Sequence, residues 1–169
     1  MYFDRTHSPT DTPMKSILLI DHGSRRDEAN YMMACMANLV QHLVGETAAV
    51  RFAHMEICEP SIEQGFAACV EAGADEVIVF PYMLSPGRHS TSDIPNMVGR
   101  AAARFPGVTY RVVPAFGVHE HLAGVILARA GIPRAHELSD DSGVCCWDPA
   151  HSNGACGDAC PAKALVPAR

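Results

Sequence analysis

Histidines follow two apolar segments of this sequence that read as buried strands. Residues 16–20 lead through Asp21 into His22, and residues 77–83 lead into a loop that contains His89. Neutral imidazole binds borderline divalent cations such as Co²⁺, Ni²⁺, Fe²⁺ and Zn²⁺. Two histidines on neighbouring strand ends, with the carboxylate of Glu56 nearby, could hold one such cation on an open surface. That arrangement suits passing the ion on.

The elements that must position these side chains alternate along the chain. Four apolar runs predict strands, namely SILLID (16–21), AAVRFAHME (48–56), EVIVFPYM (76–83) and TYRVVPAF (109–116). Between the runs, apolar residues at three- and four-residue spacing predict helices with one buried face each. The first such face comprises Met32, Met33, Met36, Leu39, Val40 and Leu43, and the last comprises Leu122, Val125 and Ile126. We therefore predict an α/β fold with a four-stranded, mainly parallel sheet and helices on both faces.

Composition divides the chain into three parts. Residues 1–14 are polar with two prolines and predict a flexible leader, residues 15–133 form the α/β domain, and residues 134–169 form a Cys-rich tail without apolar periodicity. The formal net charge is −6, and no basic stripe forms, which argues against nucleic acid as a partner. No apolar run is long enough for a membrane helix, and residues 1–14 lack signal-peptide features, so we expect a cytoplasmic protein.

The segment after the first predicted strand permits two other interpretations, both weakly supported. Gly23 and the helix that begins near Arg25 could bind a phosphate, and Ser24 could be a hydrolase nucleophile. However, the sequence contains neither G-x-G-x-x-G nor G-x-x-x-x-G-K, and it lacks the G-x-S-x-G elbow of such hydrolases. The absence of these motifs leaves metal binding by histidine as the stronger interpretation.

Four segments carry a resemblance to a known family. LLIDHGSRRDEAN, HMEICEPSIEQGF, GADEVIVFPYMLSPGRHSTSDIP and VVPAFGVHEHLAGVI occur in the order and spacing of the class II chelatases. Over residues 15–131 the chain most closely resembles the short sirohydrochlorin cobaltochelatase and ferrochelatase family. The resemblance implies a chelatase-like three-layer sandwich, a homodimer, and insertion of a divalent metal ion into sirohydrochlorin for cobalamin or sirohaem biosynthesis. It also implies that His22 and His89 hold the ion.

The remaining site residues are assigned around these histidines. Glu56 is expected to be an accessory ligand or a proton acceptor, although a surface carboxylate explains it equally well. The substrate-binding candidates of the two loops are Ser24, Arg25, Arg26, Gly87 and Arg88. The arginines could pair with the eight substrate carboxylates or be solvated, and Gly87 could instead serve a turn with positive φ. His54 is expected to be packed within its strand, and His119 to have a structural role at a helix start.

Seven cysteines are many for a chain of this length, and four of them crowd into the tail. Cys145, Cys146, Cys156 and Cys160 could bind an iron–sulfur cluster, bind zinc, or remain without a ligand, because their spacing matches no standard motif. Cys35 and Cys69 lie on apolar helix faces and are predicted core residues.

The function predicted from the sequence is that of a sirohydrochlorin chelatase, with Co²⁺ as the first choice of ion and Fe²⁺ or Ni²⁺ as alternatives. The same imidazoles accept all three ions, so the sequence does not choose among them. The alternative function is a non-catalytic carrier of the metal or the tetrapyrrole, which would use the same histidines for delivery.

Overall fold

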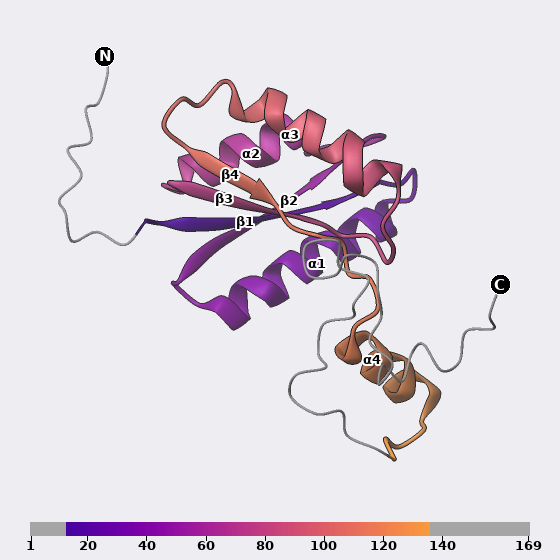
Figure 1. The fold of residues 1–169 in the computed structure, drawn as a ribbon. Coiled ribbons are helices and arrows are strands. Elements are labelled where there is room, and N and C mark those ends of the chain that lie inside the picture. The colour runs from indigo at the N-terminus through magenta and orange to yellow at the C-terminus, as the bar shows by residue number, and fades with distance from the viewer. Residues whose placement is uncertain (1–12, 136–169) are drawn as a thin grey trace, which may run out of the picture.

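The computed structural model describes residues 13–135, which form an alternating series of strands and helices (Figure 1). The elements are β1 (Lys15–Asp21), α1 (Asp27–Val44), β2 (Ala48–His54), α2 (Ile62–Glu71), β3 (Glu76–Pro81), the π-helical turn η1 (His89–Asp93), α3 (Ile94–Ala102), β4 (Thr109–Val112) and α4 (Glu120–Ala130). The leader lies almost wholly outside the described residues, and so does the tail with its four cysteines.

The four strands form one sheet in the order β2-β1-β3-β4, and every pair of neighbours is parallel. Helix α1 covers one face, and α2 and α3 cover the other (Figure 1). The predicted α/β sandwich is thus confirmed. Because the chain leaves β1 toward one edge and β3 toward the other, the carboxyl ends of these two adjacent strands mark the position where such sheets bind ligands.

The core consists of two apolar clusters, one on each face of the sheet. Alternation along β1 directs Leu18 and Ile20 toward α2 and α3, where Phe66 is fully buried, and directs Leu19 toward Met33 of α1. A complete capping box at Ser61 begins α2, since its hydroxyl accepts from the Gln64 N–H and the Gln64 side chain returns to the Ser61 N–H. Both faces of β1 are therefore covered, as expected of a central parallel strand.

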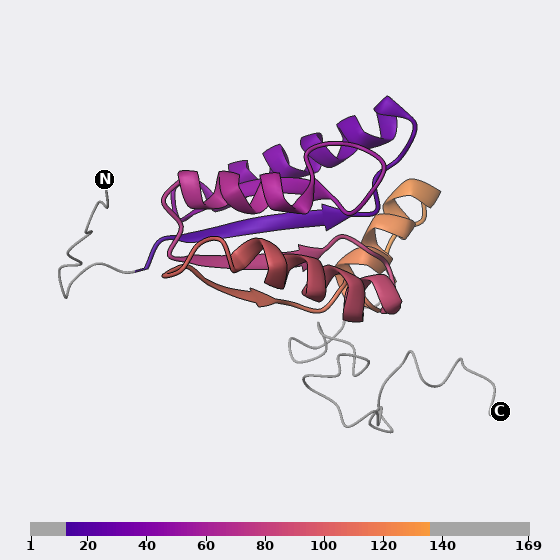
Figure 2. The same ribbon diagram turned by 90° about the horizontal axis from the view of Figure 1, so that it is seen from above.

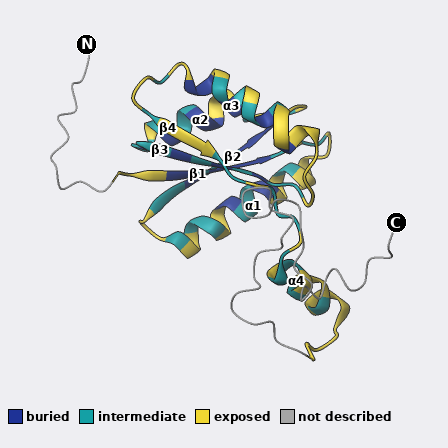
Figure 3. Cartoon of the chain, in the orientation of Figure 1, coloured by how far each residue is buried: buried dark blue, intermediate teal, exposed yellow. Residues whose placement is uncertain are grey.

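The predicted buried face of α1 is wrong in part (Figure 3). Met33 is buried, and Met36 and Val40 pack partly, but Met32, Leu39 and Leu43 are exposed. Cys35 is exposed as well, whereas Cys69 is fully buried as predicted. Only one narrow stripe of α1 reaches the sheet, so the rest of its apolar surface has no partner among residues 13–135.

Helix α4 projects beyond the carboxyl end of the sheet (Figures 1 and 2). None of its residues is buried, and Val125 and Ile126 are more than half exposed, which corrects the predicted packing of this helix. His119 caps the helix, because its ring nitrogen Nδ1 accepts a hydrogen bond from the His121 N–H at 3.1 Å. None of the helices formed by residues 13–135 is long and apolar enough to span a bilayer.

Candidate metal site at the carboxyl end of the sheet

His22 and His89 approach each other beyond the carboxyl ends of β1 and β3. Their ring centroids lie 5.3 Å apart at an interplanar angle of 71°. Both side chains are exposed, so the pair faces solvent. The structure brings together the two residues that the sequence singled out, while their role as metal ligands remains a prediction.

The orientation of the His89 ring is set by Asp93, one helical turn further along the chain. Nδ1 of His89 lies 2.9 Å from Oδ2 of Asp93, and Nε of Arg88 lies 3.5 Å from the other carboxylate oxygen. A carboxylate on one ring nitrogen keeps the proton there and leaves Nε2 as the ligand atom. The sequence analysis missed Asp93, although its four-residue spacing from His89 is a usable signal.

The backbone beside His22 requires glycine at the next position. Gly23 has a φ of +84°, and a Cβ there would lie 2.2 Å from the carbonyl oxygen of Glu56. The predicted positive φ at Gly87 is wrong, since Gly87 does not occupy that region. Its N–H donates to the Ser90 hydroxyl at 3.0 Å, and its carbonyl accepts from Thr91, so it begins the turn that carries His89.

Glu56 is exposed at the end of the β2 segment, and its N–H donates to the carbonyl of His22 at 3.1 Å. Within residues 13–135, no three His, Cys, Asp or Glu side chains are arranged to hold a metal ion. The role of Glu56 as an accessory ligand or proton acceptor stays a prediction. Glu56 lines a hollow beside the histidine pair.

This hollow has a volume of about 340 Å³ and lies between the β2 end and α3. It is lined by Met55, Glu56, Asp93, Asn96, Met97 and Arg100. Met55 is buried, while Asn96 and Arg100 are exposed one turn apart on α3. The side chain of Arg100 makes no hydrogen bond or ion pair within the described part of the chain. Sequence reasoning missed both polar residues because their helix was interpreted only by its apolar face.

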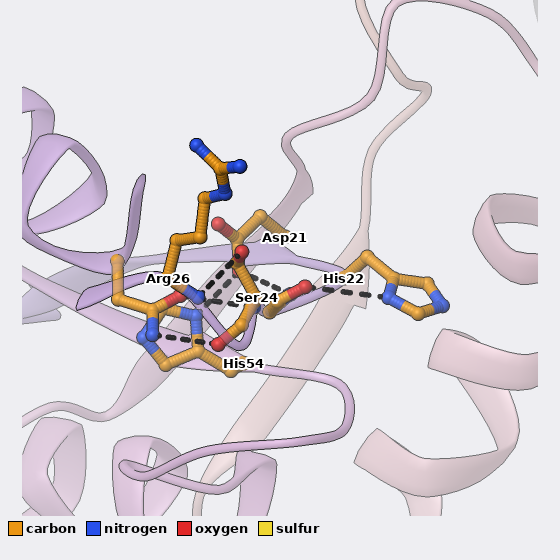
Figure 4. A network of polar contacts seen from close by, with 7 residues as sticks. Asp21, His22, Ser24, Arg26 and His54 are labelled. Carbon is orange, nitrogen blue, oxygen red and sulfur yellow. Dashed lines mark hydrogen bonds and ion pairs between the residues drawn. The ribbon is translucent and has the colours of Figure 1, made fainter. Parts of the chain in front are cut away.

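The remaining candidates after β1 have local roles as well (Figure 4). The Ser24 hydroxyl accepts from the Arg26 N–H at 3.1 Å, and the Ser24 backbone is held by the side chain of Asn30. Arg26 occupies the N-cap position of α1, and both Arg25 and Arg26 are exposed. Arg88 is 86% exposed. All three arginines are accessible to a ligand, although Arg88 also pairs with Asp93.

Comparisons with known proteins show which proteins this chain is similar to. The chain is 41% identical over 110 residues to the chloroplastic sirohydrochlorin ferrochelatase of Arabidopsis thaliana, which covers 65% of this chain and 48% of that protein. It is 33% identical over 116 residues to the sirohydrochlorin cobaltochelatase of Priestia megaterium, which covers 69% of this chain and 37% of that protein. The chain thus spans about half the length, or less, of these curated relatives.

Solved structures give the same result. The sirohydrochlorin chelatase SirB of Bacillus subtilis subspecies spizizenii, solved in complex with cobalt, has a TM-score of 0.65 at 30% identity and covers 70% of this chain and 50% of that one. A CbiX protein of Marinobacter aquaeolei VT8 has a TM-score of 0.58 at 28% identity and covers 69% of this chain and 94% of that one. Residues 16–131 match the CbiX family model, which is more than half of the sequence. The chain belongs to the CbiX family.

Proposed function

We propose that the protein inserts a divalent metal ion into sirohydrochlorin. The observation that carries this proposal is the pair of imidazoles, His22 and His89, whose rings lie 5.3 Å apart on an open surface. Two neutral nitrogens leave most of the coordination positions of a divalent ion to water. An ion held in this way can exchange its remaining water for the pyrrole nitrogens of a tetrapyrrole.

The protons displaced during insertion need acceptors near the ring. Two pyrrole N–H protons leave as the cation enters, so the reaction consumes the free macrocycle and M²⁺ and gives the metallated macrocycle and two protons. His22 and His89 can accept protons once the ion has left them, because a neutral imidazole nitrogen that no longer binds a metal is a proton acceptor. Glu56 lines the hollow and is exposed, so its carboxylate is a further proton acceptor.

The macrocycle would lie over the hollow beside the histidine pair. The half-buried side chain of Met97 offers apolar contact for the ring face, and Arg100 can pair with a peripheral carboxylate of the substrate. Ser24, Arg25, Arg26, Gly87 and Arg88 lie along the same end of the sheet and remain candidates for further substrate contacts. A bidentate pair with guanidinium would be the strongest of these interactions.

Among the ions we propose Co²⁺ first, with Fe²⁺ and Ni²⁺ as alternatives. Relatives are named for both cobalt and iron, and imidazole ligands do not separate these ions sharply. Steady-state rates with each ion on sirohydrochlorin would decide among them. The predicted iron–sulfur or zinc site of the tail lies outside the described residues. Its test is the visible spectrum and the iron, sulfide and zinc content of anaerobically purified protein.

We also propose that the active form is a homodimer. Val125 and Ile126 of α4, with Met32 and Leu43 of α1, are large apolar side chains that residues 13–135 leave exposed. We favour a second copy of this chain as the partner that covers these side chains, because the chain spans about half the length of its longer relatives. Sedimentation should give a dimer, and Ile126→Asp should shift it toward monomer.

A turnover experiment separates the chelatase from the alternative carrier. Protein incubated with excess sirohydrochlorin and Co²⁺ should yield many equivalents of product per protein, whereas a carrier would give at most one. His22→Ala and His89→Ala should each abolish turnover. Product that stops at one equivalent, or turnover that survives both substitutions, would overturn the proposed function.

A further inference from the structure

A buried histidine lies directly beneath the loop that carries His22. His54, the last residue of β2, is only 1% exposed, and its Nδ1 lies 2.5 Å from Oδ1 of Asp21 (Figure 4). It was predicted to be packed, and it is, but the proposed chemistry gives this titratable ring no task. Its carboxylate partner is the residue that immediately precedes His22.

The same carboxylate oxygen also binds the chain on the other side of His22. Oδ1 of Asp21 accepts a hydrogen bond from the Gly23 N–H at 3.0 Å. Asp21 thus connects a fixed residue of the neighbouring strand to the residue that follows His22. With both flanking residues held by one carboxylate, the backbone of His22 has little freedom to turn.

Two backbone hydrogen bonds continue the β1–β2 connection past the strand ends. The Met55 N–H donates to the Asp21 carbonyl at 2.8 Å, and the Glu56 N–H donates to the His22 carbonyl at 3.1 Å. These two bonds hold the carbonyl groups of Asp21 and His22 but leave the backbone at Gly23 without a partner from β2. The Asp21 side chain supplies the constraint at Gly23, where the backbone turns with its φ of +84°.

His54 is itself firmly held, which makes it an effective anchor. Its N–H donates to the carbonyl of Pro60 at 2.8 Å, and its ring packs edge-on against Phe52 at a centroid distance of 5.6 Å. A carboxylate bound to a ring that cannot move is itself restricted to one rotamer. Residues that hydrogen-bond to the supports of a metal ligand commonly control the geometry of that ligand.

From these contacts we infer that Asp21 and His54 form a positioning pair that holds His22 at the distance from His89 needed to share a divalent cation. The inference rests on the proposed function only in that His22 and His89 are the metal ligands. Neither Asp21 nor His54 is expected to touch the ion or the macrocycle. Their loss should weaken the grip on the ion and leave the macrocycle surface of the hollow intact.

The test is Co²⁺ binding to the full chain without sirohydrochlorin, followed by calorimetry and by the visible spectrum of the ion. His22→Ala identifies the relevant equivalent of Co²⁺, since the tail cysteines can bind the metal too. His54→Phe keeps the buried volume but removes the ring nitrogen, and it should weaken this equivalent about tenfold. In turnover assays the KM for Co²⁺ should rise while the KM for sirohydrochlorin stays within about twofold.

Conservative variants and a matched control separate positioning from general damage. The side-chain nitrogen of Asn can occupy about the position of Nδ1, so His54→Asn should restore most of the affinity. Val77→Ala removes buried core volume at the amino end of β3 and should lower the melting temperature without changing Co²⁺ affinity. If His54→Phe does not fold, Asp21→Asn carries the test, with the same direction of effect.

The outcomes distinguish this inference from the proposed function. If His22→Ala still binds as many equivalents of Co²⁺ as the wild type, the proposed metal site is wrong. Normal Co²⁺ affinity in both His54→Phe and Asp21→Asn, together with a clear loss in His22→Ala, would overturn the positioning pair and leave the metal site standing. If Val77→Ala loses as much Co²⁺ affinity as the other variants, the loss reflects lower stability of the fold and the positioning pair is overturned.

Discussion

Replacement of Asp93 should weaken metal binding in two graded steps. Asp93→Asn preserves shape and can still accept a hydrogen bond from Nδ1 of His89, but it removes the negative charge. Asp93→Ala removes the partner altogether. A hydrogen bond to a charged group contributes about 1.5–3 kcal/mol, against about 0.5–1.5 kcal/mol for a neutral one. The change from carboxylate to amide should therefore cost about 1 kcal/mol, which is about a fivefold loss in Co²⁺ affinity.

The exposure of the pair sets the upper limit of the effect. The His89 side chain is 48% exposed and that of Asp93 is 29% exposed, so water screens part of the interaction. Asp93→Ala should consequently cost about tenfold, near the low end of the range for carboxylates that support metal-binding histidines. The ion pair of Asp93 with Arg88 adds little, because the arginine side chain is 86% exposed.

The assay is the initial rate of Co²⁺ insertion into sirohydrochlorin as a function of Co²⁺ concentration, with Co²⁺ binding measured separately. Glu71→Gln is the matched control, since it removes one exposed carboxylate at the carboxyl end of α2, near the amino ends of the strands and away from the histidines. Wild-type behaviour of both Asp93 variants would refute the reasoning, as would an equal loss in Glu71→Gln.

Three further predictions concern separate parts of the structure. Arg100→Met should raise the KM for sirohydrochlorin several-fold with little change in kcat, while Arg104→Met, an exposed control beyond the end of α3, should not; equal effects would indicate general electrostatics. Gly23→Ala should lower the free energy of unfolding by about 1–3 kcal/mol in urea titrations and weaken Co²⁺ binding, because the left-handed backbone and the nearby carbonyl both oppose a Cβ. Burial raises the pKa of the Cys69 thiol to about 12, so this residue should resist alkylation at pH 8 until the protein unfolds, while Cys35 reacts in the native state; peptide mapping by mass spectrometry would show early labelling of Cys69 if this is wrong.

Much of the fold was predictable because each strand is indicated by a run of several apolar residues. Leu18, Leu19 and Ile20 are apolar without alternation, which is typical of a strand covered on both faces, and the structure covers both. The approach of His22 to His89 followed from the same argument, because neighbouring parallel strands bring their carboxyl ends to one edge. No detail of side-chain packing was needed for that prediction.

The errors arose where periodicity could not report what covers a helix. Met32 and Leu43 continue the apolar spacing of α1, yet they lie outside the stripe of the helix that packs on the sheet. Apolar spacing shows that one face of a helix is apolar. It does not show whether that face packs against the same chain or against another one. Cys35 was misplaced for this reason.

The site residues that were missed depend on local geometry that emerges only after folding. Asp93 meets His89 because η1 winds the chain through one turn between them, and the sequence did not specify a helix there. The contact between His54 and Asp21 joins residues 33 positions apart, at the paired ends of two strands. Register fixes that contact, and register becomes visible only when both strands are placed.

The strand order has a consequence for how such a site can change over time. Adjacent strands in a sheet are held about 4.8 Å apart by their backbone hydrogen bonds, and β1 and β3 are adjacent here. The two imidazoles come from the segments that follow these neighbouring strands, so the strand order brings the segments together, while the segments themselves set the separation of the rings. Replacement of the ligand type in either segment would leave the strand pairing unchanged and could change the choice of metal without rebuilding the domain.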